Sequence, residues 1–264
     1  MADIQSIYAW GMVSDDGYGR EINEDAVKSI DLSEDVSLFI IADGMGSLPS
    51  GLQPALIVIN EIEQIIRRVF DSHHDALLEN PDLFLREALL TANRVLGAFA
   101  IANEERYSGF GASVTCCLVY GGSRFCFAHC GDTRLYLLRE HPQDKSTHIS
   151  QLTRDHTKAI KLLDEGVISA EQYHTHPDRM IYTSGLGSYA SPEIQIFDSR
   201  LKKRDILLMT TDGIHYAIKP DAMAEIVMSA PNCAVAVESL VQAGKMLKYI
   251  DNMSAIMVFL IPTE

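Results

Sequence analysis

Six short runs of aliphatic and aromatic residues constrain the fold of this chain more than any other feature of its sequence. Each run is five to eight residues long and is bounded by Gly, Asp or Pro, a pattern typical of buried β-strands. The runs are 36–42, 113–120, 124–129, 134–139, 206–210 and 255–261. The pair Gly121-Gly122 separates two of them and predicts a hairpin. These runs predict a fold built around β-sheet.

Helical periodicity is confined to other parts of the chain. Apolar side chains recur at three- and four-residue intervals after Pro54 and again after Pro81, and a third helix is expected over 234–248. Residues 157–187 are less regular, with a short helix expected near 159–163, and are interpreted as a surface flap. Because strands and helices occupy separate stretches, the sequence predicts a layered α+β architecture with largely antiparallel sheets.

Composition excludes several classes of protein. The chain has 264 residues, of which 47% are hydrophobic, and neither a repeat nor a Pro/Gly-rich linker divides it, so a single domain over 1–264 is expected. With 22 Lys and Arg against 36 Asp and Glu, the net charge of −14 argues against nucleic acid as a partner. It leaves a small phosphorylated substrate possible, since a metal can reverse the sign of charge locally.

The sequence also indicates in which compartment the protein is expected. Apolar runs fall far short of the ~20 residues that a bilayer requires, and the first residues lack the pattern of a signal peptide. Five cysteines without C-x-x-C spacing are interpreted as buried thiols rather than as a disulfide or zinc framework. We therefore expect a cytoplasmic protein that does not bind membranes.

Aspartates occur where the expected strands begin and end. Asp43 and Asp212 follow strands, whereas Asp251 precedes the last one. If that last strand runs antiparallel to the others, the three carboxylates gather at one edge of the sheet, and such oxygen clusters suit Mg²⁺ or Mn²⁺. Asp132 lies in a turn between two strands, and Arg20 precedes the acidic pair Glu24-Asp25. Taken alone, each position is more often an ordinary turn or a solvated surface residue than part of a metal site.

Other catalytic chemistries find little support. The histidines lack H-E-x-x-H spacing and are interpreted as core or polar residues. Neither a phosphate-binding loop nor a G-x-S-x-G nucleophile motif is present.

Taken in order, the acidic segments resemble the metal-dependent PP2C-type (PPM) protein serine/threonine phosphatases, and specifically their bacterial branch. The resemblance runs from about residue 14 to residue 258. It rests on Arg20-x-x-Asn23-Glu24-Asp25, Asp43-Gly44-Met45-Gly46, Gly131-Asp132-Thr133-Arg134-Leu135-Tyr136, Leu152-Thr153-Arg154-Asp155-His156, Thr211-Asp212-Gly213 and Asp251-Asn252. It implies a four-layer α/β/β/α sandwich of two mainly antiparallel sheets flanked by helices, with the active site in a cleft at one end.

The resemblance also implies roles for individual residues. Asp43 would bridge two Mn²⁺ or Mg²⁺ ions, the Gly44 carbonyl would hold one of them, and Asp212 and Asp251 would hold the other. Glu24 would reach the metal directly or through water, and Asp25 would act through water or from behind the ligands. Asp132 would help to bind a third, weaker ion. Arg20 would grip the substrate phosphate, as its planar guanidinium can make two parallel charge-assisted hydrogen bonds.

The activity implied is hydrolysis of phosphoserine and phosphothreonine in proteins, in opposition to a Ser/Thr kinase. A water shared by two cations would attack phosphorus in line, without a phosphoenzyme. Two alternatives remain: a catalytically silent binding or scaffold module, and a phosphatase for small phosphomonoesters.

The chain also departs from the family pattern. Met45 replaces the histidine of many eukaryotic members, Ser47 replaces a glycine, and the segment 109–113 is altered.

Overall fold

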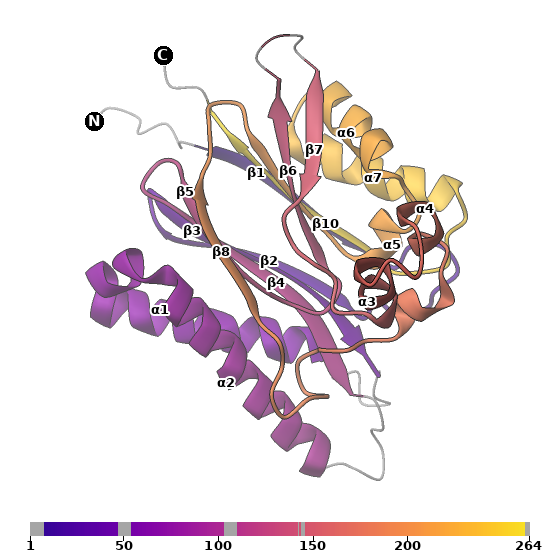
Figure 1. Ribbon diagram of the computed structural model, residues 1–264. Coiled ribbons are helices and arrows are strands. Elements are labelled where there is room, and N and C mark those ends of the chain that lie inside the picture. Colours follow the sequence, from indigo (N-terminus) through magenta and orange to yellow (C-terminus); the bar gives the residue numbers. More distant parts are fainter. Residues whose placement is uncertain (1–7, 47–53, 103–109, 142, 144–145, 262–264) are drawn as a thin grey trace.

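Two five-stranded antiparallel sheets form the centre of the molecule (Figure 1). The structure is a computed structural model that describes residues 8–46, 54–102, 110–141, 143 and 146–261. In order across the first sheet lie β1 (Tyr8–Asp15), β10 (Met253–Leu260), β9 (Ile206–Thr210), β6 (Arg134–Glu140) and β7 (Thr147–Gln151). The second sheet has the order β2 (Asp25–Ser33), β3 (Val36–Met45), β4 (Gly111–Tyr120), β5 (Arg124–Cys130) and β8 (Gln195–Arg200).

Alternation along the central strands explains why the sheets are covered on both faces. In β3, Leu38 and Ile40 belong to the core beneath the helices, whereas Phe39 and Ile41 belong to the core between the sheets. Side chains on a strand point alternately to its two faces, so an uninterrupted apolar run must be buried twice. The segments expected to be strands therefore lie between two layers.

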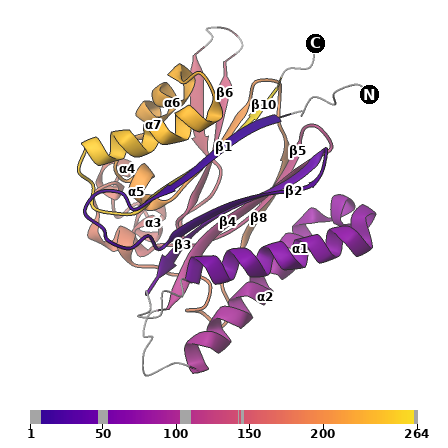
Figure 2. The same ribbon diagram turned by 180° about the vertical axis from the view of Figure 1, so that it is seen from behind.

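Helices supply the two outer layers, as Figures 1 and 2 show from opposite sides. The helices α1 (Pro54–Glu79) and α2 (Pro81–Ala102) cover the second sheet, while α6 (Pro220–Ser229) and α7 (Cys233–Met246) cover the first. The four-layer sandwich expected from the family resemblance is confirmed. Among the described residues, no helix combines the length and the apolar character needed to cross a membrane.

Residues 157–187, which the sequence analysis interprets as a flap, contain three short helices between β7 and β8. They are α3 (Lys158–Asp164), α4 (Ala170–Tyr173) and the 3₁₀-helix η1 (Pro177–Met180). The last short helix, α5 (Asp212–His215), follows β9 and lies at the same end of the sandwich (Figure 1). Thus the flap and α5 lie close to the positions of the predicted site.

Candidate metal centre

The predicted carboxylates come from both sheets and meet where the sheets approach each other. Asp43 is a cross-strand partner of Asp25 between β3 and β2 in the second sheet. Asp212 begins α5 directly after β9, and Asp251 directly precedes β10, which runs antiparallel to β9 in the first sheet. The expectation that one sheet edge carries all three aspartates is therefore wrong. Asp43 is also not beyond its strand, because β3 continues to Met45.

Asp132 reaches the same region from a crossover between the sheets. It lies in a turn between two strands, as expected, but β5 pairs within the second sheet and β6 within the first, so this turn joins two layers rather than forming a hairpin. Asp132 as a residue is 1% exposed, and its Oδ1 accepts a hydrogen bond of 2.8 Å from the Tyr182 hydroxyl. Its backbone N–H donates to Ser113 Oγ at 2.8 Å.

Burial and mutual proximity raise the pKa values of these acids. Burial raises the pKa of Asp25 to about 7, and Asp251 and Asp132 add to the shift. Burial and then the neighbouring charge of Asp155 raise the pKa of Asp132 to about 7. The pKa values of Asp43 and Asp212 are also raised well above the usual range, by burial and then by other members of the group. Because their negative charges repel one another, these carboxylates are stabilised when they bind either a proton or a metal cation.

A hydrogen-bond network fixes the acids of the two sheets to each other. Thr211 Oγ1 donates to Asp25 Oδ2 at 2.8 Å and accepts from the Ser254 N–H at 3.0 Å. Next to Asp212, Gly213 lies so close to the 251–252 turn that an added Cβ would be 1.9 Å from the Asn252 carbonyl oxygen. Only glycine permits this approach, so the beginning of α5 and the beginning of β10 are held together.

Residues 16–24 form the loop that carries Arg20, and Asn252 anchors it. The Asn252 side chain donates to the carbonyl oxygens of Asp16 and Ile22, at 3.1 and 2.9 Å, and accepts from the Glu24 N–H at 3.0 Å. Sequence reasoning gave Asn252 no role, because all its partners lie more than two hundred positions earlier in the chain.

Arg20 lies at the acidic group rather than apart from it. Its Nη2 donates to Asp251 Oδ1 at 2.6 Å, and its Nη1 is 3.9 Å from Glu24 Oε2. The Arg20 side chain is 41% exposed, so part of its guanidinium remains open to a ligand from solvent.

These residues fit divalent cations by their chemistry. The donors are hard carboxylate oxygens, which Mg²⁺ and Mn²⁺ prefer. Asp132 Oδ2 is buried and has no hydrogen-bond partner among the described residues. No three Asp, Glu, His or Cys side chains of these residues meet in metal-ligand geometry, so binding requires the carboxylates to draw closer or to be joined by water. Two departures from the family pattern, at Ser47 and Gly109, lie outside the described residues.

Comparison with known proteins decides the family. A family model described as protein phosphatase 2C matches residues 18–253. The chain belongs to the protein phosphatase 2C family. The architecture, the order of the acidic segments and the match over most of the chain agree with one another.

Curated relatives of this family member include two bacterial phosphatases. The serine/threonine protein phosphatase PstP of Mycobacterium tuberculosis is 27% identical over 244 residues, which are 92% of this chain and 43% of PstP. The serine/threonine phosphatase stp of Listeria monocytogenes is 26% identical over 249 residues, 93% of each protein. The chain therefore spans less than half of PstP and nearly all of stp.

Solved structures give the same fold. The M. tuberculosis PstP/Ppp structure has a TM-score of 0.81 and 25% identity, covering 97% of this chain and 99% of that one. A second structure is the catalytic domain of PstP in complex with two manganese ions, at 24% identity and a TM-score of 0.78, covering 97% of this chain and 99% of that one.

A buried ion pair next to the metal centre of this phosphatase 2C-family chain was missed from sequence. The Arg134 guanidinium donates through Nε to Asp155 Oδ1 at 2.9 Å and through Nη2 to Oδ2 at 2.6 Å. The hydroxyl of Tyr173, on α4 of the flap, donates to the same carboxylate. Both ionic residues stand in segments that carried the family resemblance, but twenty-one positions separate them and neither segment indicates the other.

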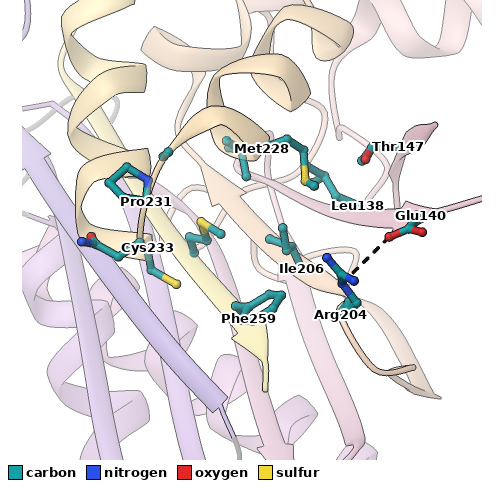
Figure 3. Close-up of a pocket in the computed structure, with 13 residues that line it drawn as sticks. Leu138, Glu140, Thr147, Arg204, Ile206, Met228, Pro231, Cys233 and Phe259 are labelled. Carbon is teal, nitrogen blue, oxygen red and sulfur yellow. Dashed lines mark ion pairs between the residues drawn. The ribbon is translucent and has the colours of Figure 1, made fainter. Parts of the chain in front are cut away.

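A separate cavity of about 280 Å³ lies away from the metal centre, between the first sheet and α6 (Figure 3). Its apolar walls include Leu138, Ile206 and Phe259, and Arg204 pairs with Glu140 at its edge, 3.9 Å apart. None of the predicted site residues lines it.

Proposed function

We propose that this chain is a metal-dependent phosphatase that removes phosphate from phosphoserine and phosphothreonine in proteins, in opposition to a Ser/Thr kinase. One observation carries the proposal: buried aspartates from two sheets gather beside Arg20 and raise one another's pKa. The names of the bacterial relatives, which are serine/threonine phosphatases, support the same activity.

The ion-binding roles are proposed residue by residue. Asp43, Asp212 and Asp251, with the Gly44 carbonyl, would hold two tightly bound Mn²⁺ or Mg²⁺ ions. The manganese complex of PstP supports this number for a related fold. When bound, such cations lower the pKa of water and neutralise charge that develops on the transferred phosphoryl group.

Other residues at the centre would adjust binding. Glu24 and Asp25 would act directly or through water, and Asp132 would contribute to a third, weaker ion. Arg20 would bind the substrate phosphate. Because its guanidinium now contacts Asp251, a cation held by that carboxylate would weaken the contact and leave Arg20 available for the substrate.

The domain assignment and the location are also proposals. We propose that residues 1–264 act as one phosphatase domain, with residues 157–187 as a flap next to the metal centre. Five cysteines, all buried and all free, support a reducing compartment such as the cytoplasm.

Turnover of a phosphothreonine peptide and of an aryl phosphate, with and without Mn²⁺, tests the activity. The wild type is expected to require the metal, and Asp212→Asn is expected to lose about 100-fold or more of its activity, since even residues behind the ligands cost about 10- to 100-fold. Asp71→Asn is the matched control, because Asp71 is exposed on α1.

The outcomes separate the alternatives. Mn²⁺-dependent turnover of small phosphomonoesters without turnover of the peptide would replace the protein substrate in our proposal. Absence of turnover on both substrates, together with absence of Mn²⁺ binding by calorimetry, would contradict the proposal entirely.

A further inference from the structure

Tyr182 connects the flap to the candidate metal centre. Its hydroxyl donates to Asp132 Oδ1 at 2.8 Å, across fifty positions of sequence. Its backbone is fixed on both sides, because Tyr182 forms a β-bridge with Thr157 and its carbonyl oxygen accepts from the Tyr189 hydroxyl at 2.8 Å. The phenol therefore reaches the carboxylate from a well-anchored part of the flap.

The contact leaves the two oxygens of Asp132 in different situations. Oδ1 is occupied by Tyr182, whereas Oδ2 is buried and unpartnered among the described residues. A buried carboxylate oxygen without a partner is costly, and a cation would remove this cost. The hydrogen bond on Oδ1 restricts rotation of the carboxylate, so it determines where Oδ2 points.

We propose that Tyr182 is a positioning residue that orients Asp132 for a divalent cation, so that the cation and the Tyr182 contact stabilise each other. Hydrogen-bond partners of ligating carboxylates commonly control metal affinity in this way. The inference rests on the metal centre of the proposed function and goes further by naming the flap residue that controls it.

The base of the flap is joined to the turn that carries Asp132. The His156 N–H donates to the Gly131 carbonyl oxygen at 2.6 Å, and the Gly131 N–H donates to His156 Nδ1 at 3.1 Å. Tyr182 is joined to this base as well, because its backbone bridges to Thr157, so the hydroxyl and the Asp132 turn are held in one arrangement. Because the cation and the Tyr182 hydroxyl act on the same carboxylate, thermodynamic linkage requires that a cation at Asp132 stabilises the Tyr182 contact as much as the contact strengthens cation binding.

Calorimetric titration of the full chain with Mn²⁺ tests the first part. Tyr182→Phe is expected to weaken the weakest Mn²⁺ site by about 10- to 100-fold and to leave the tighter sites unchanged. Tyr120→Phe is the matched control, since the Tyr120 hydroxyl also donates to a carboxylate, Asp198, at 2.8 Å, but at the opposite end of β4. In an Asp132→Asn background, Tyr182→Phe is expected to have no further effect.

Hydrogen exchange over residues 170–185 tests the coupling. Mn²⁺ is expected to slow exchange there in the wild type and in Tyr120→Phe, but not in Tyr182→Phe. Wild-type Mn²⁺ affinities in Tyr182→Phe, or an equal loss in Tyr120→Phe, would overturn the proposal, as would equal protection of the flap in all variants. These measurements require no turnover, so failure of the proposed catalytic activity would be visible separately in the phosphatase assays.

Discussion

Replacement of Arg134 by methionine is expected to destabilise the protein by about 3–5 kcal/mol. The Arg134 side chain is 2% exposed and that of Asp155 is 0% exposed, so the pair lies entirely inside the protein. Burial alone would raise the pKa of Asp155, but the Arg134 guanidinium and the Tyr173 hydroxyl hold this pKa below its usual value. Methionine fills a similar volume yet leaves the buried carboxylate without its cation.

The magnitude can be measured by urea denaturation and by thermal melting. A loss of this size corresponds to a decrease in Tm of about 6–10 °C, at roughly 2 °C per kcal/mol for a domain of this length. Because the pKa of Asp155 is lowered in the folded state, the interaction is fully present above the unfolded pKa of about 4 and disappears as pH falls through the folded value. The difference between wild type and variant is therefore expected at pH 7 and should shrink in acid.

Two variants complete the test. Arg67→Met removes an exposed ion pair with Glu63 on α1, where Arg67 is 48% exposed, and should cost at most about 0.5 kcal/mol. The double variant Arg134→Met with Asp155→Leu should recover part of the lost stability, because neither side chain is then charged, although the Tyr173 hydroxyl loses its acceptor. A loss below about 1 kcal/mol in Arg134→Met, or a double variant no more stable than the single one, would refute the reasoning.

Two further predictions concern the acidic end of the sandwich. In EDTA, the stability of the protein should decrease as pH rises from about 4 to about 7. The reason is that Asp25 and Asp132, each with a pKa of about 7, hold more protons in the folded state than in the unfolded state. Tm values at pH 5.5, 6.5 and 8 check this; Mn²⁺ should abolish the trend, and a Tm that rises with pH would contradict the prediction. Gly131→Ala should cost more than about 1 kcal/mol in urea titrations and weaken Mn²⁺ binding, because Gly131 has φ +112° and an added Cβ would lie 2.5 Å from Ser113 Cβ. Gly166→Ala, with φ +70° in open space, separates backbone strain from this clash.

The sequence predicted the interior of the fold much better than its margins. All six expected strands are the three central strands of each sheet, and β9 has the expected bounds. The four strands that were missed, β1, β2, β7 and β8, are the four sheet edges. In β2, β7 and β8 polar and charged residues interrupt the apolar pattern, as in the mostly exposed Thr147–Gln151, and such residues prevent edge strands from pairing with other chains. The edge strand β1 is different, because it carries an apolar run over 8–13 that sequence reasoning overlooked.

The sequence indicated which acidic residues form the site, but it did not indicate how they are arranged in space. Strand ends indicated Asp43, Asp212 and Asp251, yet local patterns do not reveal which sheet a strand joins, and this determined how the acids meet. Contacts such as Tyr182 to Asp132 were missed because their partners are distant in sequence and a tyrosine has no pattern of its own. Such residues become visible only when tertiary structure brings them together.

The position of β10 has a consequence for biosynthesis. This strand lies between β1 and β9 in the first sheet, although it is the last strand of the described chain, and Asp251 and Asn252 directly precede it. While residues 253–260 are still inside the ribosome, β1 and β9 have no common neighbour and the loop that carries Arg20 has no anchor. The first sheet, and with it the proposed metal centre, can therefore be completed only after this strand has left the ribosome.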